Sequence, residues 1–297
     1  MFGVLEAGGT KMICAVGNRN LEILDQVRIA TRRPEETFDE IKEFFAKYKT
    51  DIESIAIGSF GPIEVNPDSD DYGKILNTPK EGWKDFNIIK CLEEDFSVPI
   101  YVTTDVNASA YGEYKVGCGE GKASLAYYTV GTGVGGGFVQ NNNFLGGASH
   151  PEMGHMIIKK DPRDTYEGGC MCHGDCLEGL ASGPNIEKRL GKSGQDLEPN
   201  DEFWDIEAGY LAQAAYNTSL MFSPDVIVFG GGVMQVEGLI EKVREKFKEL
   251  MNGYIEIKEL ESYIVRPRYD GKSATYGLLI LAQEILLKNK APNKGLL

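Results

Sequence analysis

Histidine is scarce in this chain of 297 residues: the sequence contains three, against six cysteines. Basic residues are also few, since 31 lysines and arginines face 45 aspartates and glutamates, which leaves a formal net charge of −14. An acidic chain lacks the basic surface that attracts nucleic acid or an anionic membrane. We therefore expect no nucleic acid and no membrane as partners. Phosphate compounds remain possible ligands of an acidic chain, because backbone N–H groups and a metal ion bind them locally.

Long apolar runs are missing as well. No stretch reaches the roughly 20 apolar residues that a membrane-spanning helix needs, and the first residues, MFGVLEAGGTK, lack the basic and apolar regions of a signal peptide. A cytoplasmic protein is expected, in which cysteines serve cores or metal ions rather than disulfides. Apolar residues make up 42% and charged residues 26% of the chain, which is typical of globular proteins. The length suggests about two domains.

Strands and helices are predicted to alternate, and the order of elements starts twice, before residue 121 and after it. Hydrophobic periodicity predicts strands at 2–5, 12–16, 21–30, 54–57, 100–104, 124–130, 137–140, 226–229 and 264–267, and helices at 34–49, 86–96, 107–114, 177–190, 201–222, 236–251 and 273–287. Alternation of this kind indicates an α/β protein whose sheets are covered by helices. Two similar halves predict two lobes with a cleft, where small molecules commonly bind.

Two glycine turns occupy the same place in the two halves: Gly8-Gly9-Thr10 before Lys11, and Gly131-Thr132-Gly133. Glycine lets backbone N–H groups approach an anion, so both turns are candidate phosphate sites, although each alone is also an ordinary hairpin turn. A third run, Gly230-Gly231-Gly232-Val233, follows a buried strand and suits an adenine ring or a plain strand-to-helix turn. Residues 131–136 also fit G-x-G-x-x-G, but strand and turn residues follow where a dinucleotide fold needs a helix.

The three histidines and half of the cysteines fall between His150 and Glu178. Within that stretch Cys170, His173 and Cys176 are evenly spaced, and His155 supplies a fourth group, the thiolate and imidazole set that Zn²⁺ takes in a tetrahedron. The spacing equally allows Cys172 in place of His173, and buried thiols beside a surface histidine are the alternative without metal. A c-type haem site is excluded, because C-x-x-C-H is absent.

Three carboxylates stand out near these motifs. Asp105 follows the strand 100–104, and a carboxylate at the C-terminal end of such a strand faces a binding crevice; local sequence alone favours a helix cap. Glu152 lies three residues before His155, and Glu178 lies two residues after Cys176. Both suit sugar hydroxyls if a metal ion fixes the backbone around them, and otherwise they are ordinary surface residues.

Together these motifs resemble the ROK family of repressors, open reading frames and kinases, and within it the bacterial fructokinases. The resemblance runs from Gly3 to about Leu287. Glu152, Gly154 and His155 match the E-x-G-H element of the family, and Cys176 and Glu178 match its C-x-E element. Other matching segments are Glu6-Ala7-Gly8-Gly9-Thr10-Lys11, Gly131-Thr132-Gly133, Thr104-Asp105-Val106-Asn107-Ala108, Pro224-Asp225 with Gly230-Gly231-Gly232-Val233, Gly58-Ser59-Phe60-Gly61-Pro62 and Asn77-Thr78-Pro79.

The resemblance implies an actin-like, ribonuclease-H-like ATPase fold. The implied domains are 1–108, completed by a C-terminal helix at about 273–289, and 109–272, which carries the zinc insertion. It implies an ATP-dependent fructokinase that is a cytoplasmic homodimer, with Mg²⁺ accompanying ATP and a structural Zn²⁺. Asp105 is implied as the catalytic base. The implied sugar-binding residues are Gly61, Asn77, Thr104, Asp105, Glu152, His155 and Glu178, and the glycine turns with Lys11 and Val233 are implied to bind the nucleotide.

Three departures from the family pattern refine these expectations. Glu6 replaces an aspartate, which lengthens the expected contact with phosphate-bound Mg²⁺. Thr104 replaces the asparagine of glucose-binding members, which argues against glucose. The fructokinase branch resembles C-x-x-H-x-x-C, and on that ground His173 rather than Cys172 is expected among the zinc ligands, with His155, Cys170 and Cys176. The alternatives are a kinase of broader specificity for mannose or glucose, and a non-catalytic sugar-sensing regulator of the same family.

Overall fold

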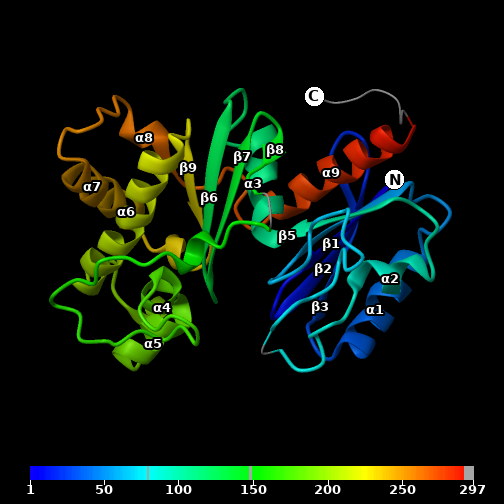
Figure 1. Ribbon diagram of the computed structural model, residues 1–297, viewed down its shortest axis with the longest axis horizontal. Helices are drawn as coiled ribbons and strands as arrows, with labels where there is room; N and C mark the ends of the chain where they lie inside the picture. The colour runs from blue at the N-terminus through cyan, green and yellow to red at the C-terminus, as the bar shows by residue number, and fades with distance from the viewer. Residues whose placement is uncertain (79, 147–148, 291–297) are drawn as a thin grey trace. The chain divides into compact units, whose positions relative to one another are not determined.

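The computed structural model describes residues 1–78, 80–146 and 149–290. Pro79, residues 147–148 and residues 291–297 lie outside the described residues. The chain divides into two compact units (Figure 1). The first comprises Met1–Gly112, Gly146–His150 and Lys272–Leu297, and the second comprises Glu113–Leu145 and Pro151–Gly271.

The first unit is built on a five-stranded sheet in the order β3-β2-β1-β4-β5. Strands β1 (Phe2–Ala7), β2 (Lys11–Gly17) and β3 (Ile23–Ala30) are antiparallel neighbours, and β4 (Ser54–Ser59) and β5 (Ile100–Thr104) run parallel to β1. Helices α1 (Pro34–Ala46) and α2 (Ile88–Glu93) accompany the sheet. The carboxyl ends of β1, β4 and β5 share one edge, where Ala7 pairs with Ser59 and Ser59 pairs with Thr104.

Successive residues of β1 point to opposite faces of this sheet, as the pleat requires. Leu5 lies in the core with Phe38 and Phe45 of α1, whereas the Glu6 side chain accepts a hydrogen bond from Thr275 of α9 (Ser273–Lys290). Helix α9 contacts β1, β4 and β5. The Glu6 carboxylate is therefore held on the α9 face of the sheet.

Two glycines allow α9 to cross α3 (Asp105–Val116) with their backbones in contact. A Cβ atom at Gly112 would lie 2.0 Å from the carbonyl oxygen of Ser273, and one at Gly277 would lie 1.9 Å from that of Ala108. No side chain fits at either position without moving a backbone. The close crossing fixes the first turn of α3, which begins with Asp105, against the rest of the first unit.

The second unit repeats the strand order, β8-β7-β6-β9-β10. Strands β6 (Ser124–Val130), β7 (Val134–Gln140) and β8 (Asn143–Phe144) are antiparallel neighbours, and β9 (Ile227–Gly230) and β10 (Ile264–Val265) run parallel to β6. The predicted internal duplication is thus confirmed at the level of topology.

Helices of the second unit pack into one core with this sheet, in which Tyr128 and Phe229 stack at 5.2 Å between ring centroids. They are α4 (Leu177–Ala181), α5 (Gly183–Leu190), α6 (Phe203–Phe222), α7 (Leu239–Met251) and α8 (Leu260–Tyr263), with short 3₁₀ turns η1 (Met153–His155), η2 (Gly194–Asp196) and η3 (Val233–Gln235).

Two predicted elements differ from the structure. The single helix predicted at 177–190 is wrong, because Ser182 is extended, with ψ of 149°, and separates α4 from α5; Pro184 at the start of α5 lacks the N–H that a continuous helix would use. The strand predicted at 137–140 begins at Val134, since its glycines lack the side chains that a hydrophobic pattern detects. The short β8 and α8 were not predicted.

Candidate active site

The first glycine turn joins β1 to β2, and Thr31, just after β3, holds it from one side. The Gly8 N–H donates to the Lys11 carbonyl at 3.0 Å. Thr31 donates its hydroxyl to the Gly8 carbonyl at 2.8 Å and its N–H to the Thr10 carbonyl at 3.1 Å. The carbonyls of Gly8, Thr10 and Lys11 are thus bonded within the protein, while the turn is exposed at Gly9 and Thr10.

Asp105 begins α3 at the edge where β1, β4 and β5 end, and it is half-buried there. Its Oδ1 accepts the N–H of Val106 at 2.8 Å. The cap expected of Asp105 from local sequence belongs instead to Thr104, whose Oγ1 accepts the Asn107 N–H at 3.1 Å. Thr104 is also only 4% exposed, so the main role of its side chain in this structure is to cap α3.

Glu6 is the electrostatic neighbour of Asp105. Burial raises the pKa of Glu6 to about 7, the hydrogen bond from Thr275 opposes that rise, and the negative charge of Asp105 adds to it. A carboxyl group with a pKa near neutrality gains or loses a proton in response to a nearby cation. Glu6 and Asp105 are therefore two carboxylates whose charges influence each other.

Gly61 and Asn77 lie on two loops that the structure ties together near the same sheet edge. The Phe60 N–H donates to the Ala7 carbonyl at 2.7 Å, and the Leu76 N–H donates to the Pro62 carbonyl at 2.8 Å. The first unit thus gathers the turn at Gly8, Gly61, Asn77, Thr104 and Asp105 around the carboxyl ends of its parallel strands, the usual position of ligands in α/β sheets.

In the second unit, the turn Gly131-Thr132-Gly133 joins β6 to β7, closed by a 2.8 Å hydrogen bond from the Gly131 N–H to the Gly133 carbonyl. Gly231 comes close to it: φ is +96°, and a Cβ atom there would lie 2.4 Å from the Val130 carbonyl oxygen. Only glycine fits at this position, and it brings the 230–232 run beside the end of β6.

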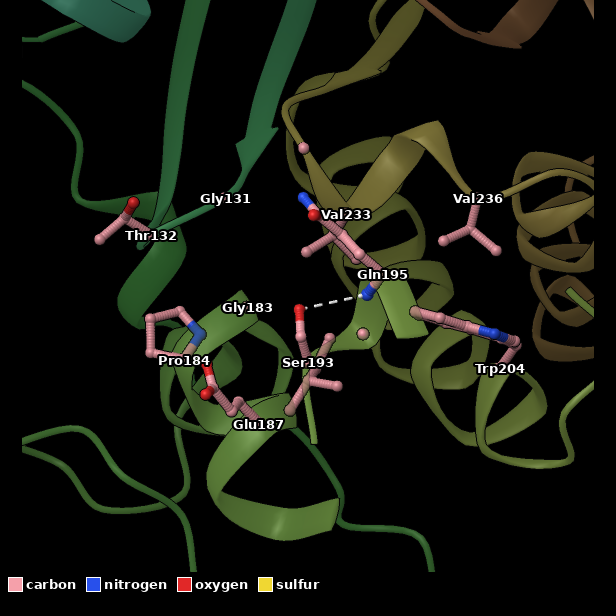
Figure 2. Close-up of a pocket in the computed structure, with 13 residues that line it drawn as sticks. Gly131, Thr132, Gly183, Pro184, Glu187, Ser193, Gln195, Trp204, Val233 and Val236 are labelled. Carbon is pink, nitrogen blue, oxygen red and sulfur yellow. Dashed lines mark hydrogen bonds between the residues drawn. The ribbon is translucent and has the colours of Figure 1, made fainter. Parts of the chain in front are cut away.

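A cavity of about 360 Å³ opens beside these two glycine runs (Figure 2). Its size suits a nucleoside. Figure 2 shows Thr132 and Pro184 on one side and Trp204 and Val236 on the other. The lining residues are Gly131, Thr132, Gly183, Pro184, Ile186, Glu187, Ser193, Gly194, Gln195, Trp204, Gly232, Val233 and Val236.

Sequence reasoning found part of this lining and missed the rest. Residues of the glycine runs were predicted, whereas those of α5, of η2 and of α6 were not. Most of them fall in two short segments, 183–187 and 193–195, which carry no recognised binding motif. Asp225, in the segment that resembles the family's nucleotide segment, accepts the N–H groups of Ala123 and Ser124 at 2.8 and 2.9 Å, so its carboxylate fastens the start of β6.

The predicted metal-binding side chains converge in the second unit. The candidate ligand atoms of His155, Cys170, His173 and Cys176 lie within 4.8 Å of one another. His155 Nδ1 is 3.6 Å from the sulfur of Cys170 and 3.6 Å from that of Cys176, and His173 Nδ1 is 3.7 Å from that of Cys170. Cys172 is exposed and outside this cluster. Two thiols and two imidazoles fit a tetrahedral Zn²⁺ site.

Glu152 and Glu178 lie close in sequence to residues of this cluster. The Glu152 carbonyl accepts the His155 N–H at 3.0 Å at the start of η1, which contacts β7. Glu178 Oε2 accepts the Val134 N–H at 3.1 Å, and its Oε1 lies 4.0 Å from His155 Nε2. The structure therefore places Glu178 between the second glycine turn and the metal cluster.

The paired sheets of identical strand order define an actin-like ATPase fold. The ROK family model matches residues 2–285, and the chain belongs to this family. It is 46% identical to the fructokinase of Streptococcus mutans, over 96% of this chain and 98% of that protein, and 43% identical to the fructokinase of Pediococcus pentosaceus, over 96% and 99%.

Among solved structures, the ROK hexokinase from Thermus thermophilus superposes with a TM-score of 0.77 at 25% identity, covering 96% of this chain and 98% of that one. Within the described residues, no helix combines the length and apolar character needed to cross a membrane.

Proposed function

We propose that this protein is an ATP-dependent fructokinase, which transfers the terminal phosphoryl group of ATP to the 6-hydroxyl of D-fructose and releases fructose 6-phosphate and ADP. The observation that carries the proposal is the identity of 43–46% to proteins named fructokinase over 96% of the chain. Support from the structure comes from the nucleoside-sized cavity beside two glycine runs and from Asp105 at a sheet edge.

In this proposal Asp105 accepts the proton of the 6-hydroxyl as the oxygen attacks the phosphoryl group. Most of the rate enhancement comes from positioning and from stabilising charge on the transferred group. The N–H groups of the turns at Gly8-Gly9-Thr10-Lys11 and Gly131-Thr132-Gly133 hold the phosphate chain. The 230–232 run with Val233 lies against the base.

Mg²⁺ would accompany the phosphates and neutralise their charge, and Glu6, whose pKa is raised to about 7, is the carboxylate that the family resemblance assigns to it. In the proposed site, Glu152, His155 and Glu178 bind the sugar, together with Gly61, Asn77 and Thr104. The hydroxyl of Thr104 accepts the Asn107 N–H and keeps its own hydrogen to donate.

Zn²⁺ would be structural in this protein. His155, Cys170, His173 and Cys176 supply four ligands, which leave no open position for Lewis-acid chemistry. What the ion would supply is rigidity, because it would join η1, which Glu152 precedes, to the 170–176 loop, which leads into α4 and Glu178. We also propose that the protein is a cytoplasmic homodimer, as the family resemblance implies; analytical ultracentrifugation tests the dimer.

The deciding experiment is to incubate the purified protein with Mg-ATP and a panel of hexoses and to identify the products. Fructose 6-phosphate from fructose, with much lower kcat/KM for mannose and glucose, is the expected result. A glucokinase of Halalkalibacterium halodurans is 29% identical over 82% of the chain, so the alternative is a hexokinase of broader specificity. Equal kcat/KM for glucose and fructose would establish that alternative, and no phosphorylated sugar would exclude both.

A further inference from the structure

Asn185 of α5 is buried, with 5% exposure, and every hydrogen-bonding atom of its side chain has a partner. Its Nδ2 donates to the Glu178 carbonyl at 3.0 Å and to the Ser182 hydroxyl at 2.8 Å. Its Oδ1 accepts the Tyr166 hydroxyl at 3.0 Å. One amide side chain thus joins α5 to the end of α4 and to the loop that leads toward Cys170.

On one side of Asn185 lies the nucleotide cavity. Its sequence neighbours Pro184, Ile186 and Glu187 line that cavity. The first N–H of α5, from Gly183, donates to the carbonyl of Gly131 in the second glycine turn at 2.8 Å. A nucleotide that fills the cavity would therefore contact α5 directly and hold it in one position.

On the other side lie the groups that surround the metal cluster. A Cβ atom at Gly169, the residue before Cys170, would lie 1.8 Å from Asn185 Oδ1, so the backbone of the metal loop rests against the amide. The Gly169 N–H also donates to the Gly179 carbonyl at 2.9 Å, next to Glu178. Any shift of the Asn185 side chain would be transmitted to the loop that carries Cys170.

We propose that Asn185 is a positioning residue through which the nucleotide cavity and the metal cluster stabilise each other. The inference rests on the proposed zinc site. A nucleotide that fixes α5 fixes the Asn185 amide, and the amide holds Glu178 and the 166–170 loop around the cluster. Bound nucleotide should therefore slow the loss of the metal, and by linkage the metal should raise nucleotide affinity by the factor by which nucleotide raises metal affinity.

The test measures transfer of zinc from the full-length protein to a chromogenic chelator, with and without saturating Mg-ADP. In the parent, Mg-ADP should slow the transfer about fivefold, in the usual range of coupling between sites. Asn185→Asp keeps the shape but cannot donate to the Glu178 carbonyl. This variant should release zinc about fivefold faster without nucleotide, the effect of about one lost hydrogen bond, and Mg-ADP should no longer slow it.

The matched control is Gln213→Glu. Gln213 of α6 makes a similar two-bond amide contact, donating to the Lys159 carbonyl at 2.9 Å and accepting its N–H at 2.7 Å, but it lines neither the cavity nor the cluster. This control should keep the slowing by Mg-ADP. If Asn185→Asp does not fold, Tyr166→Phe removes one of the three hydrogen bonds of Asn185. In that variant Mg-ADP should slow zinc transfer by at most half as much as in the parent.

The outcomes separate the two proposals. A parent that holds no metal after purification, and none after added Zn²⁺, would contradict the zinc site and this inference together. A parent that holds zinc and binds Mg-ADP, but releases zinc at the same rate with and without Mg-ADP, would overturn the role of Asn185 alone, whereas a parent that binds no Mg-ADP would contradict the proposed function as well. An Asn185→Asp protein in which Mg-ADP still slows zinc release, as in the Gln213→Glu control, would also overturn the role of Asn185.

Discussion

His155 and Glu178 face each other across 4.0 Å, from Nε2 of the ring to Oε1 of the carboxylate. The other ring nitrogen of His155, Nδ1, is directed at the sulfurs of Cys170 and Cys176. An imidazole that binds a metal through Nδ1 carries its hydrogen on Nε2, where a carboxylate orients the ring. One ring therefore connects the proposed metal site to a carboxylate proposed to bind the sugar.

Metal removal should accordingly impair sugar binding more than nucleotide binding. Protein purified without added metal should contain about one zinc per chain, and stripping it should raise KM for fructose by more than the roughly fivefold rise in KM for ATP that the coupling through Asn185 predicts. Elemental analysis and steady-state kinetics on the same samples provide the measurement.

The ligand set is tested by two single substitutions in the same loop. His173→Ala should lower the zinc content, because it removes one of four ligands. Cys172→Ala should leave it unchanged, because Cys172 is exposed and outside the cluster. The reverse pattern would show that Cys172 is the ligand and that the four-residue assignment is wrong.

Asp105→Asn should lower kcat for fructose phosphorylation on the order of a hundredfold or more, since it removes the proposed base and leaves the size of the side chain unchanged. ADP affinity and the thermal transition should stay close to those of the parent. Asp39→Asn, on the exposed face of α1, is the matched control and should be fully active. Turnover of Asp105→Asn within tenfold of the parent would remove Asp105 from the base role.

Thr31→Val should weaken ATP binding, because the variant keeps the shape of the side chain and loses the hydroxyl that holds the Gly8 carbonyl. A lost hydrogen bond of about 1 kcal/mol predicts roughly a fivefold rise in KM for ATP. KM for fructose should stay unchanged, and Thr31→Ser should restore ATP binding. An unchanged KM for ATP would mean that the turn holds its shape without Thr31.

The sequence predicted those parts of the site that lie on short motifs. The glycine turns, Asp105 after a strand, and the cluster of His155, Cys170, His173 and Cys176 are each encoded within a few residues or by rare residue types. The alternation of strands and helices likewise predicted the duplicated topology, because burial of one face imposes a period on the sequence.

What escaped prediction depends on contacts between distant segments. Thr31 holds a turn more than 20 residues away, and Trp204 of α6 lines the cavity beside the glycine runs. Thr104 rather than Asp105 caps α3, which only the geometry of the helix start decides. The break between α4 and α5 was missed because apolar residues continue on both sides of Ser182 and hide the proline signal.

Glu207 of α6 offers a test of the buried electrostatics of the second unit. Within the described residues, both of its carboxylate oxygens are buried without a hydrogen-bond partner. Burial raises the pKa of Glu207 well above its ordinary value, the positive charge of Arg189 opposes this, and Asp164 adds to it. The folded protein therefore binds a proton at Glu207 that the unfolded chain releases once the pH exceeds about 4.5.

Because the folded state holds the extra proton, this group makes the protein less stable as pH rises from about 4.5 toward the raised pKa of Glu207. Glu207→Gln removes the titration and keeps the shape, so it should be at least as stable as the parent at pH 5 and more stable at pH 8. Thermal unfolding at both pH values measures this, with Glu245→Gln on the exposed side of α7 as control. A Gln variant that loses stability at pH 8 would show that Glu207 is ionised and paired with Arg189 in the folded protein.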